Sequence, residues 1–215
     1  MNRKTVFIVA AVLLLAAFGL IALFYKSDTA LRSDVQGKLE LLVRSHASTV
    51  GPPEAKVHIV EFLDPACEAC RAFYPYVKQL MAANPGKIKL TVRHVAFHEG
   101  ADFAVQVLEA SKKQDKYWPT LERLLASQSR WAINHKVVPE LVWAQLDGLG
   151  LDPERLQRDM KDPEIGRNMG QDEADAKKLR VQKTPEYFVN GRQMTTFGQD
   201  QLRQLVQEEL ARSYP

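Results

Sequence analysis

The sequence of 215 residues predicts an α/β domain with a helical insertion, preceded by an N-terminal transmembrane helix. Three observations support this class. Two apolar, β-branched stretches, 57–63 and 88–97, flank an amphipathic stretch at 67–83, which is the pattern of a strand, a helix and a strand. Residues 101–180 carry helix signals and no strand signal. A run of 19 residues, 6–24, contains no charge.

The uncharged run 6–24 is predicted to be a membrane anchor. As a helix rising about 1.5 Å per residue, it nearly spans a hydrocarbon core of about 30 Å. Arg3 and Lys4 precede it, so residues 1–5 should be a cytoplasmic tail of a single-pass protein of the inner membrane. A cleaved signal peptide is the alternative, although the run is long for one and no small-x-small site follows it. Both interpretations place the rest of the chain outside the cytoplasm, in the periplasm.

Residues 25–53 are expected to form a linker that carries a short amphipathic helix. Val35, Leu39, Leu42 and Val43 recur at helical spacing, and Gly51-Pro52-Pro53 ends the pattern. The folded domain is therefore predicted to run from 54 to 212.

The first half of this domain is predicted to be a βαβ unit. The strand 57–63 ends at Asp64-Pro65, and the helix 67–83 contains Pro75, which should kink it. The strand 88–97 follows a turn. Two strands joined by a helical crossover pair in parallel.

The second half is predicted to be a helical insertion followed by a hairpin and a helix. The helical segments expected within 101–180 are 101–113, 117–127, 139–149, 153–160 and 163–179. Asn190-Gly191 is a strong signal for a two-residue hairpin turn, between strands at 183–189 and 192–196. A closing helix is expected at 199–212. This order of elements predicts a thioredoxin-like core with helices inserted in its middle.

Charge and cysteine content narrow the function. The net charge is +3 and the basic residues are spread along the chain, so no nucleic-acid partner is predicted. The chain has only two cysteines, Cys67 and Cys70, so a disulfide framework does not hold the fold together.

The Cys67-Glu68-Ala69-Cys70 motif predicts thiol–disulfide exchange. A cysteine at a helix N-terminus faces unpaired backbone N–H groups, which stabilise its thiolate. Cys67 should therefore be the nucleophile, and Cys70, one turn further on, the resolving thiol. A static bridge and a metal-binding thiol pair are the alternatives. Zinc needs about four ligands and no second cysteine pair exists, although His58, His94 or His98 could contribute, so neither a metal site nor a cofactor is predicted.

Several motifs resemble the DsbA family of thiol–disulfide oxidoreductases. They are Glu61-Phe62 before the cysteine pair, the pair itself with Phe73, the segment 93–97, and the segment 181–191 with Thr184-Pro185. The resemblance implies a cis-Pro185 beside the cysteines, which shapes a groove for substrate. It also implies that Glu61 is a buried acid that relays protons to Cys70. Residue alternation alone leaves open that Glu61 points to solvent.

Two departures from that family concern the direction of electron flow. The residues between the cysteines are Glu68 and Ala69, and the charge of Glu68 should oppose a thiolate at Cys67. A threonine before the proline, as in Thr184-Pro185, resembles the choice found in Dsb-like isomerases and reductases as much as that found in oxidants. The predicted function is disulfide exchange with exported proteins, served by a membrane redox partner, and a periplasmic reductase or isomerase remains the alternative.

Overall fold

The structure is a computed structural model that describes Asn2 and residues 37–215. The predicted anchor at 6–24 lies outside the described residues. Among the residues that are described, no helix is long and apolar enough to cross a membrane. The chain divides into two compact units, Met1–Glu40 and Leu41–Pro215, and the second unit contains the whole sheet.

A five-stranded sheet with the order β1-β3-β2-β6-β7 forms the centre of the second unit. Its strands are β1 (Ser48–Val50), β2 (Val57–Leu63), β3 (Ile88–His94), β6 (Glu186–Val189) and β7 (Arg192–Gln193). β2 and β3 pair in parallel, which confirms the predicted βαβ unit, and every other pairing is antiparallel. Asn190 and Gly191 connect β6 to β7 with φ angles of 47° and 81°, as a hairpin turn of type I′ requires.

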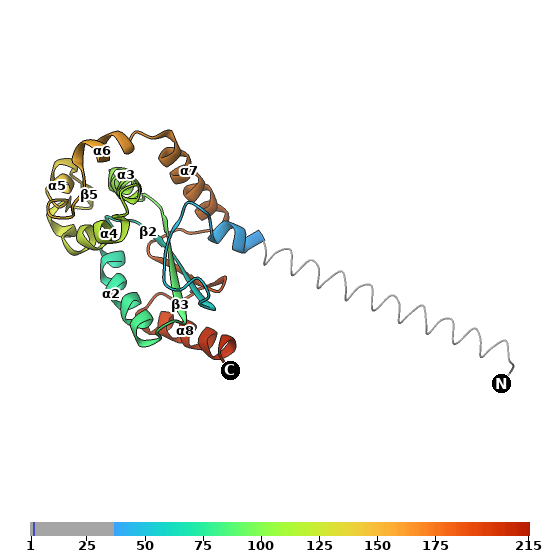
Figure 1. Cartoon of the computed structure of the whole chain (residues 1–215). Helices are drawn as coiled ribbons and strands as arrows, with labels where there is room; N and C mark the ends of the chain where they lie inside the picture. Colours follow the sequence, from blue (N-terminus) through green and yellow to red (C-terminus); the bar gives the residue numbers. More distant parts are fainter. Residues whose placement is uncertain (1, 3–36) are drawn as a thin grey trace. The chain divides into compact units, whose positions relative to one another are not determined.

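Helices cover both faces of this sheet. They are α2 (Glu68–Ala83), α3 (Ala101–Lys112), α4 (Tyr117–Ala126), α5 (Pro139–Trp143), α6 (Pro153–Asp159), α7 (Pro163–Lys178) and α8 (Gln199–Ser213). The apolar sides of α2 and α8 pack in one core with Val57, Ile59 and Leu63. Val60 and Phe62, on the opposite face, pack against Ala176 of α7. Figure 1 shows α3, α4, α5 and α6 gathered at one end of the sheet, away from α8.

The stretch predicted to be a linker contributes to the domain. Only residues 37–42 of the described part are helical there, and Ser48–Val50 form the edge strand β1, with the Thr49 and Thr91 hydroxyls 2.6 Å apart. The compact unit begins at Leu41 instead of residue 54. Three residues are too few to give a recognisable strand pattern, so the sequence does not reveal β1.

The inserted block is not entirely helical, which corrects the prediction for 101–180. A short hairpin joins β4 (Ala132–Ile133) to β5 (Lys136–Val137), and α5 ends at Trp143 instead of residue 149. Asn134 and His135 form the turn of the β4–β5 hairpin, with φ angles of 51° and 62°. Two-residue strands carry too little periodicity to be predicted. The buried apolar residues of the block, Trp131 among them, pack in the core.

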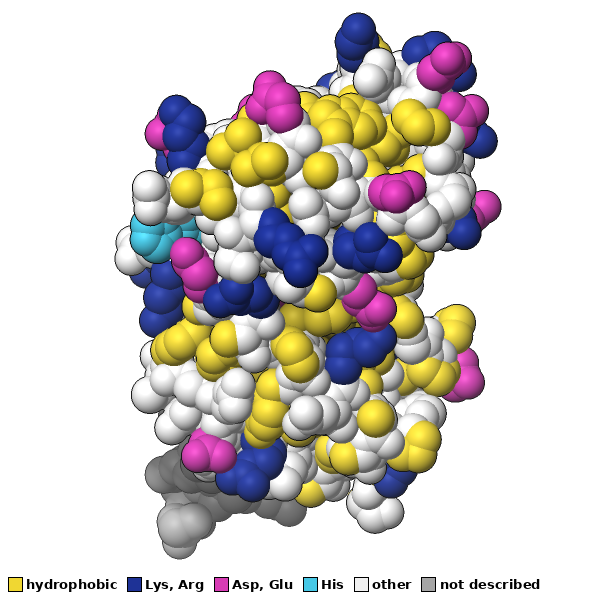
Figure 2. Space-filling view, turned by 90° about the vertical axis from the view of Figure 1, so that its left-hand side faces the viewer, with side chains coloured by type: hydrophobic (Ala, Val, Ile, Leu, Met, Phe, Trp, Pro, Cys, Tyr) yellow, Lys and Arg dark blue, Asp and Glu magenta, His cyan; other side chains and the backbone are white. Residues whose placement is uncertain are grey.

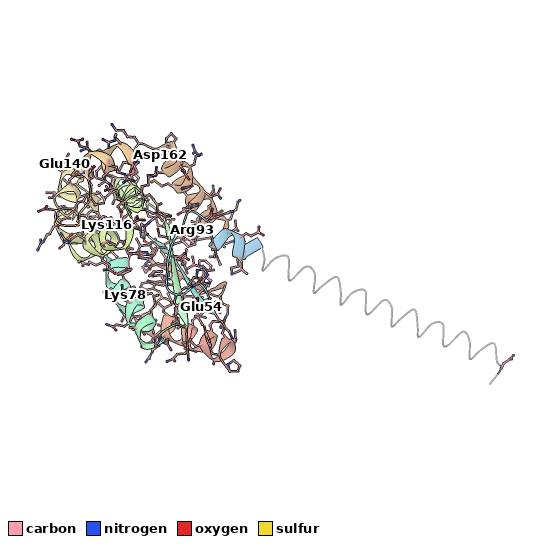
Figure 3. All side chains as sticks on the ribbon, in the orientation of Figure 1. Glu54, Lys78, Arg93, Lys116, Glu140 and Asp162 are labelled. Carbon is pink, nitrogen blue, oxygen red and sulfur yellow. The ribbon has the colours of Figure 1, made fainter. Side chains whose placement is uncertain are left out.

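A buried ionic network attaches α7 and the backbone at Leu41 and Leu42 to the sheet. Arg93 is fully buried, and its guanidinium donates to Asp172 at 2.8 Å and to Asp175 at 2.9 Å. It also donates to the carbonyl oxygens of Leu41 and Leu42. Figure 3 labels Arg93 inside the domain, whereas Lys78 and Glu140 lie at its periphery. The network therefore closes the sheet face opposite α2.

Candidate active site

The two cysteines lie where β2 leads into α2. Cys67 is the N-cap residue of α2, with extended φ and ψ of −80° and 121°, and Cys70 lies in the first turn of the helix. Both thiols are free. Cys67 keeps 7% of its surface exposed and Cys70 keeps none, so Cys67 is the more accessible of the two sulfurs.

Local hydrogen bonds give the two thiols opposite acidities. The pKa of Cys67 falls to about 6, chiefly because the Cys70 thiol hydrogen-bonds to its sulfur. A hydrogen bond with the Thr184 side chain and the backbone N–H groups of Ala69 and Cys70 lower it further, against the effect of burial. These N–H groups are the unpaired donors of the first helical turn. Burial raises the pKa of Cys70 well above its ordinary value. Cys67 is thus the ionised thiol at neutral pH.

Glu61 is fully buried, which excludes the arrangement in which it points to solvent. It lies in β2 directly opposite Tyr187 of β6, on the face that carries Ile59 and Leu63. Within the described residues its carboxylate oxygens and the Tyr187 hydroxyl have no hydrogen-bond partner, although the hydroxyl is near enough to limit the rise in the pKa of Glu61. Burial raises that pKa to about 8, and the charge of Cys67 adds to the rise. A proton therefore resides on Glu61 near neutral pH.

The segment before β6 forms the other side of the site. The Thr184–Pro185 peptide bond is cis, and Pro185 is buried while Thr184 is half-buried. In its protonated form the Cys67 thiol donates a hydrogen bond of 3.2 Å to the carbonyl oxygen of Thr184. Next to this segment, the Phe73 ring lies 5.9 Å from that of Tyr187 and 4.7 Å from that of Phe197, which is 41% exposed. These rings give the site an apolar border.

Two side chains, Gln128 and Asp64, hold the active-site loop. The buried Gln128 amide donates to the carbonyl oxygens of Pro65 at 2.8 Å and of Cys67 at 2.9 Å. The Asp64 carboxylate accepts from the backbone N–H of Ala66 at 2.8 Å, as a turn residue does. Gln128 comes from the inserted block, so only the tertiary structure reveals its contact with the loop.

Glu68 and Ala69 lie between the cysteines as predicted, but Glu68 is directed elsewhere. Its carboxylate lies 3.2 Å from Nδ1 of His135, a residue of the β4–β5 hairpin. The pKa of Cys67 is governed by hydrogen bonds and burial, and the charge of Glu68 is not among its main causes. The expected opposition between Glu68 and the Cys67 thiolate is therefore not a leading effect. Ala69 is half-buried and packs against the core.

The histidines considered as ligands to the thiols have other partners. His58 lies 2.7 Å from the Thr91 hydroxyl, and His94 lies 2.8 Å from the Tyr117 hydroxyl. Nδ1 of His98 lies 2.8 Å from the Asp64 carboxylate. None of the three histidines joins a ligand set with the cysteines among the described residues.

Comparison with known proteins identifies the family. The family model described as thioredoxin matches residues 44–208. A solved thioredoxin-like oxidoreductase from Silicibacter pomeroyi is 32% identical, with a TM-score of 0.69, over 81% of this chain and 97% of that one. The chain belongs to the thioredoxin family, and its predicted thioredoxin-like α/β fold is confirmed.

Further relatives have names that match the predicted resemblance. The probable disulfide bond formation protein D of Bacillus anthracis is 28% identical over 80% of this chain and 82% of that protein. The solved thiol–disulfide exchange protein α-DsbA2 of Wolbachia pipientis has a TM-score of 0.69 at 21% identity, over 85% of this chain and 97% of that one. The predicted resemblance to DsbA-type proteins is thus confirmed. The enzyme class expected from the sequence, thiol–disulfide oxidoreductase, is also the class of these relatives.

Other curated relatives are larger proteins. A Na⁺/H⁺ antiporter NhaA of Herminiimonas arsenicoxydans is 28% identical over 67% of this chain, which spans only 22% of the antiporter. A second antiporter, of Salinispora tropica, is matched over 24% of its length. The similarity therefore concerns a module that also occurs within longer chains.

Proposed function

We propose that this chain is a thiol–disulfide oxidoreductase that exchanges disulfides with exported proteins through Cys67 and Cys70. The observation that carries the proposal is the pairing of a partly exposed thiol with a pKa of about 6 and a fully buried partner thiol of raised pKa. Such a pair needs no cofactor, because the two sulfurs themselves store and release two electrons.

In the oxidising direction, a substrate thiolate attacks Sγ of Cys67 in the Cys67–Cys70 disulfide. The sulfur–sulfur bond breaks, Cys70 leaves as a thiolate, and a mixed disulfide joins the substrate to Cys67. A second substrate thiolate then attacks the substrate sulfur of that mixed disulfide. The substrate disulfide forms, and Cys67 leaves as the thiolate that its surroundings stabilise. The substrate has lost two electrons and the enzyme has gained them.

Glu61 is proposed to exchange a proton with Cys70 during these steps. A buried thiolate is costly, so the departing Cys70 sulfur needs a proton. Glu61 is buried on the same side of the sheet, acts electrostatically on Cys70, and has a pKa of about 8. An acid with that pKa gives up and regains a proton near neutral pH.

Thr184, Pro185 and the aromatic border are proposed to bind the substrate chain. Thr184 is half-buried and lies within hydrogen-bonding distance of the Cys67 sulfur. Phe197 is exposed beside Phe73, which offers apolar surface to an unfolded segment. Glu68 and Ala69, between the cysteines, would face the same substrate.

The depressed pKa of Cys67 favours the role of disulfide donor. A stabilised thiolate stabilises the reduced form, so the oxidised form gives up its disulfide more readily. A pKa of about 6 lies between the ~3.5 of strong oxidants and the ~7 of thioredoxin itself. The name of the Bacillus relative, a disulfide bond formation protein, supports this direction. A periplasmic reductase or isomerase is the alternative that a strongly negative potential would reveal.

We also propose that residues 6–24 anchor the chain in the inner membrane, with residues 1–5 inside and the catalytic domain in the periplasm. The uncharged run and the preceding Arg3 and Lys4 support this orientation. A membrane redox partner would then reoxidise the cysteine pair. The anchor requires that the protein stay in the membrane fraction after an alkaline carbonate wash, and a mature N-terminus near Asp28 would contradict it.

The catalytic assignment is tested by replacing each cysteine separately in a peptide-oxidation assay. Cys67→Ser should abolish exchange, because the attacked sulfur is gone. Cys70→Ser cannot form the enzyme disulfide and should not oxidise the peptide, but with a disulfide-bonded substrate its Cys67 should still attack and accumulate as a mixed disulfide, because no second enzyme thiol is left to resolve it. Glu140→Gln, an exposed change in α5, is the control and should behave as wild type. Turnover that survives in both cysteine variants would refute the assignment.

A further inference from the structure

Three side chains with metal-binding atoms meet beside the cysteine pair. They are Glu68, His98 and His135, and one potential ligand atom of each lies within 4.8 Å of those of the other two. Neither cysteine belongs to this group. It is therefore distinct from a metal site built on the thiol pair.

Three separate elements bring these residues together. Glu68 is the first helical residue of α2, His98 follows β3, and His135 occupies the tip of the β4–β5 hairpin. The hairpin is held against the loop after β3, because Val137 donates its N–H to the carbonyl oxygen of Glu99 at 2.9 Å and Lys136 pairs with the Glu99 carboxylate at 2.5 Å. The inserted block thus delivers a histidine to the active-site helix.

His98 has a carboxylate partner of the kind that metal-binding histidines commonly have. Its Nδ1 lies 2.8 Å from Oδ2 of Asp64, a fully buried carboxylate that also accepts the backbone N–H groups of Phe97 and His98. A carboxylate on one ring nitrogen fixes the ring and leaves the other nitrogen available for a metal. Asp64 is therefore suited to a supporting role one shell outside the ligands.

The remaining two ligands have room to adjust. The side chains of Glu68 and His135 are 48% and 70% exposed, and the Glu68 carboxylate already lies 3.2 Å from Nδ1 of His135. The His98 and His135 rings lie nearly parallel with their centroids 6.0 Å apart. An ion pair as exposed as Glu68–His135 adds little stability by itself. On the face in Figure 2, histidine atoms lie at the surface beside an acidic side chain.

We propose that Glu68, His98 and His135 form a transition-metal site that takes Zn²⁺. Two imidazoles and one carboxylate are a recurring protein ligand set for Zn²⁺, with water in the fourth position. Ligand atoms about 2.0–2.2 Å from a tetrahedral ion lie closer together than 4.8 Å, and rotation of the two exposed side chains closes that difference. A cation here would be bound by Glu68, which directly follows Cys67 in the sequence.

The test uses the full-length chain in detergent, stripped with EDTA and then oxidised so that the disulfide removes both thiols as ligands. Zinc chloride is titrated in by calorimetry. One Zn²⁺ per chain should bind, and His98→Asn, His135→Asn and Glu68→Gln should each weaken binding by about 10-fold or more. The control Glu140→Gln removes an exposed carboxylate elsewhere and should bind as wild type.

Thermal unfolding of each variant without metal shows whether it is folded. The proposal fails if the oxidised wild-type chain binds no Zn²⁺, or if folded His98 and His135 variants bind it as tightly as wild type. Because the thiols are blocked throughout, neither result bears on disulfide exchange. Failure of this site is therefore distinguishable from failure of the proposed enzymatic function.

Discussion

Sγ of Cys67 lies 3.2 Å from the carbonyl oxygen of Thr184, 117 residues further along the chain, and the protonated thiol donates a hydrogen bond to it. This contact joins the N-terminus of α2 to the segment that leads into β6. It exists because β6 pairs with β2, the strand that precedes the cysteines. The central pairing of the sheet therefore brings Cys67, the proposed nucleophile, to the proposed substrate-binding segment.

The acidity of Cys67 should depend on the thiol of Cys70. Thiolate absorbance against pH, measured on the reduced protein with EDTA present, should show one thiol ionising with a midpoint near pH 6. Cys70→Ala removes the donor that lowers the pKa most and should move the midpoint upward, toward the ordinary value of 9.0. Cys70→Ser keeps an O–H donor and should move it less. Equal midpoints in the two variants would show that the Cys70 hydrogen bond does not set the acidity.

The side chain of Glu68 should have little influence on Cys67. Its carboxylate faces His135 at 3.2 Å, and the pKa of Cys67 is lowered by hydrogen bonds with Cys70, Thr184 and the backbone, not by the charge of Glu68. Glu68→Gln should therefore leave the midpoint of thiolate formation nearly unchanged in the same absorbance titration. A clear fall in the midpoint would restore the expectation from sequence that this charge opposes the thiolate.

Because of Glu61, the free energy of unfolding of the domain should fall as the pH rises. Its pKa is raised from 4.5 to about 8 in the folded state, so between these values the folded state holds more protons than the unfolded state. Stability then falls with rising pH over that window. Glu61→Gln removes the effect and should raise the free energy of unfolding at pH 7 by about 3 kcal/mol, at 1.36 kcal/mol per pH unit above 4.5.

Urea unfolding of the reduced protein at pH 5 and pH 7 measures this difference. The gain from Glu61→Gln should be small at pH 5 and large at pH 7. Glu140→Gln, an exposed acid in α5, is the matched control and should be neutral at both. A gain that is independent of pH would mean that Glu61 does not carry the raised pKa.

Removal of Arg93 should destabilise the domain strongly. Arg93→Met leaves Asp172 and Asp175 without their buried cation, and the loss of one partner of a buried pair costs about 3–5 kcal/mol. Lys78→Met breaks the exposed pair with Glu122, at 2.7 Å, and should cost about 1 kcal/mol or less. Chemical denaturation at pH 7 compares the two, and similar losses would contradict the importance of burial.

The pH dependence of the Arg93 variant gives a second check. Burial alone would raise the pKa values of Asp172 and Asp175, but the arginine and histidine partners of these two residues hold both pKa values below the ordinary range. The network therefore stabilises the fold above the unfolded pKa of about 3.9 and loses that contribution as the pH falls below it. The difference between wild type and Arg93→Met should shrink on acidification.

Features with strong local signals could be predicted from the sequence. The β-branched run of β2, the cysteine pair after it and the Asn190-Gly191 turn are all local, and the structure has each of them. The side of β2 that Glu61 occupies could not be decided, because a central strand is buried on both faces and loses its alternation. The family resemblance supplied that placement instead.

The contacts that complete the site are not local. Gln128 reaches the active-site loop from the inserted block. His135 reaches Glu68 from a hairpin whose two strands are only two residues long. Both positions fall between the helices predicted at 117–127 and 139–149, and neither carries a local signal for a site. Only the packing of the inserted block against the cysteine-bearing helix gives them a role.

The reduction potential of the Cys67–Cys70 pair, measured by equilibration in a glutathione buffer with EDTA, tests the central claim most directly. A disulfide donor whose nucleophile has a pKa of about 6 should lie between the ~−120 mV of the strongest oxidants and the ~−270 mV of thioredoxin. A value at or below ~−270 mV would make the protein a reductant and contradict the proposed direction. A pair that fails to equilibrate with glutathione at all would contradict thiol–disulfide exchange itself.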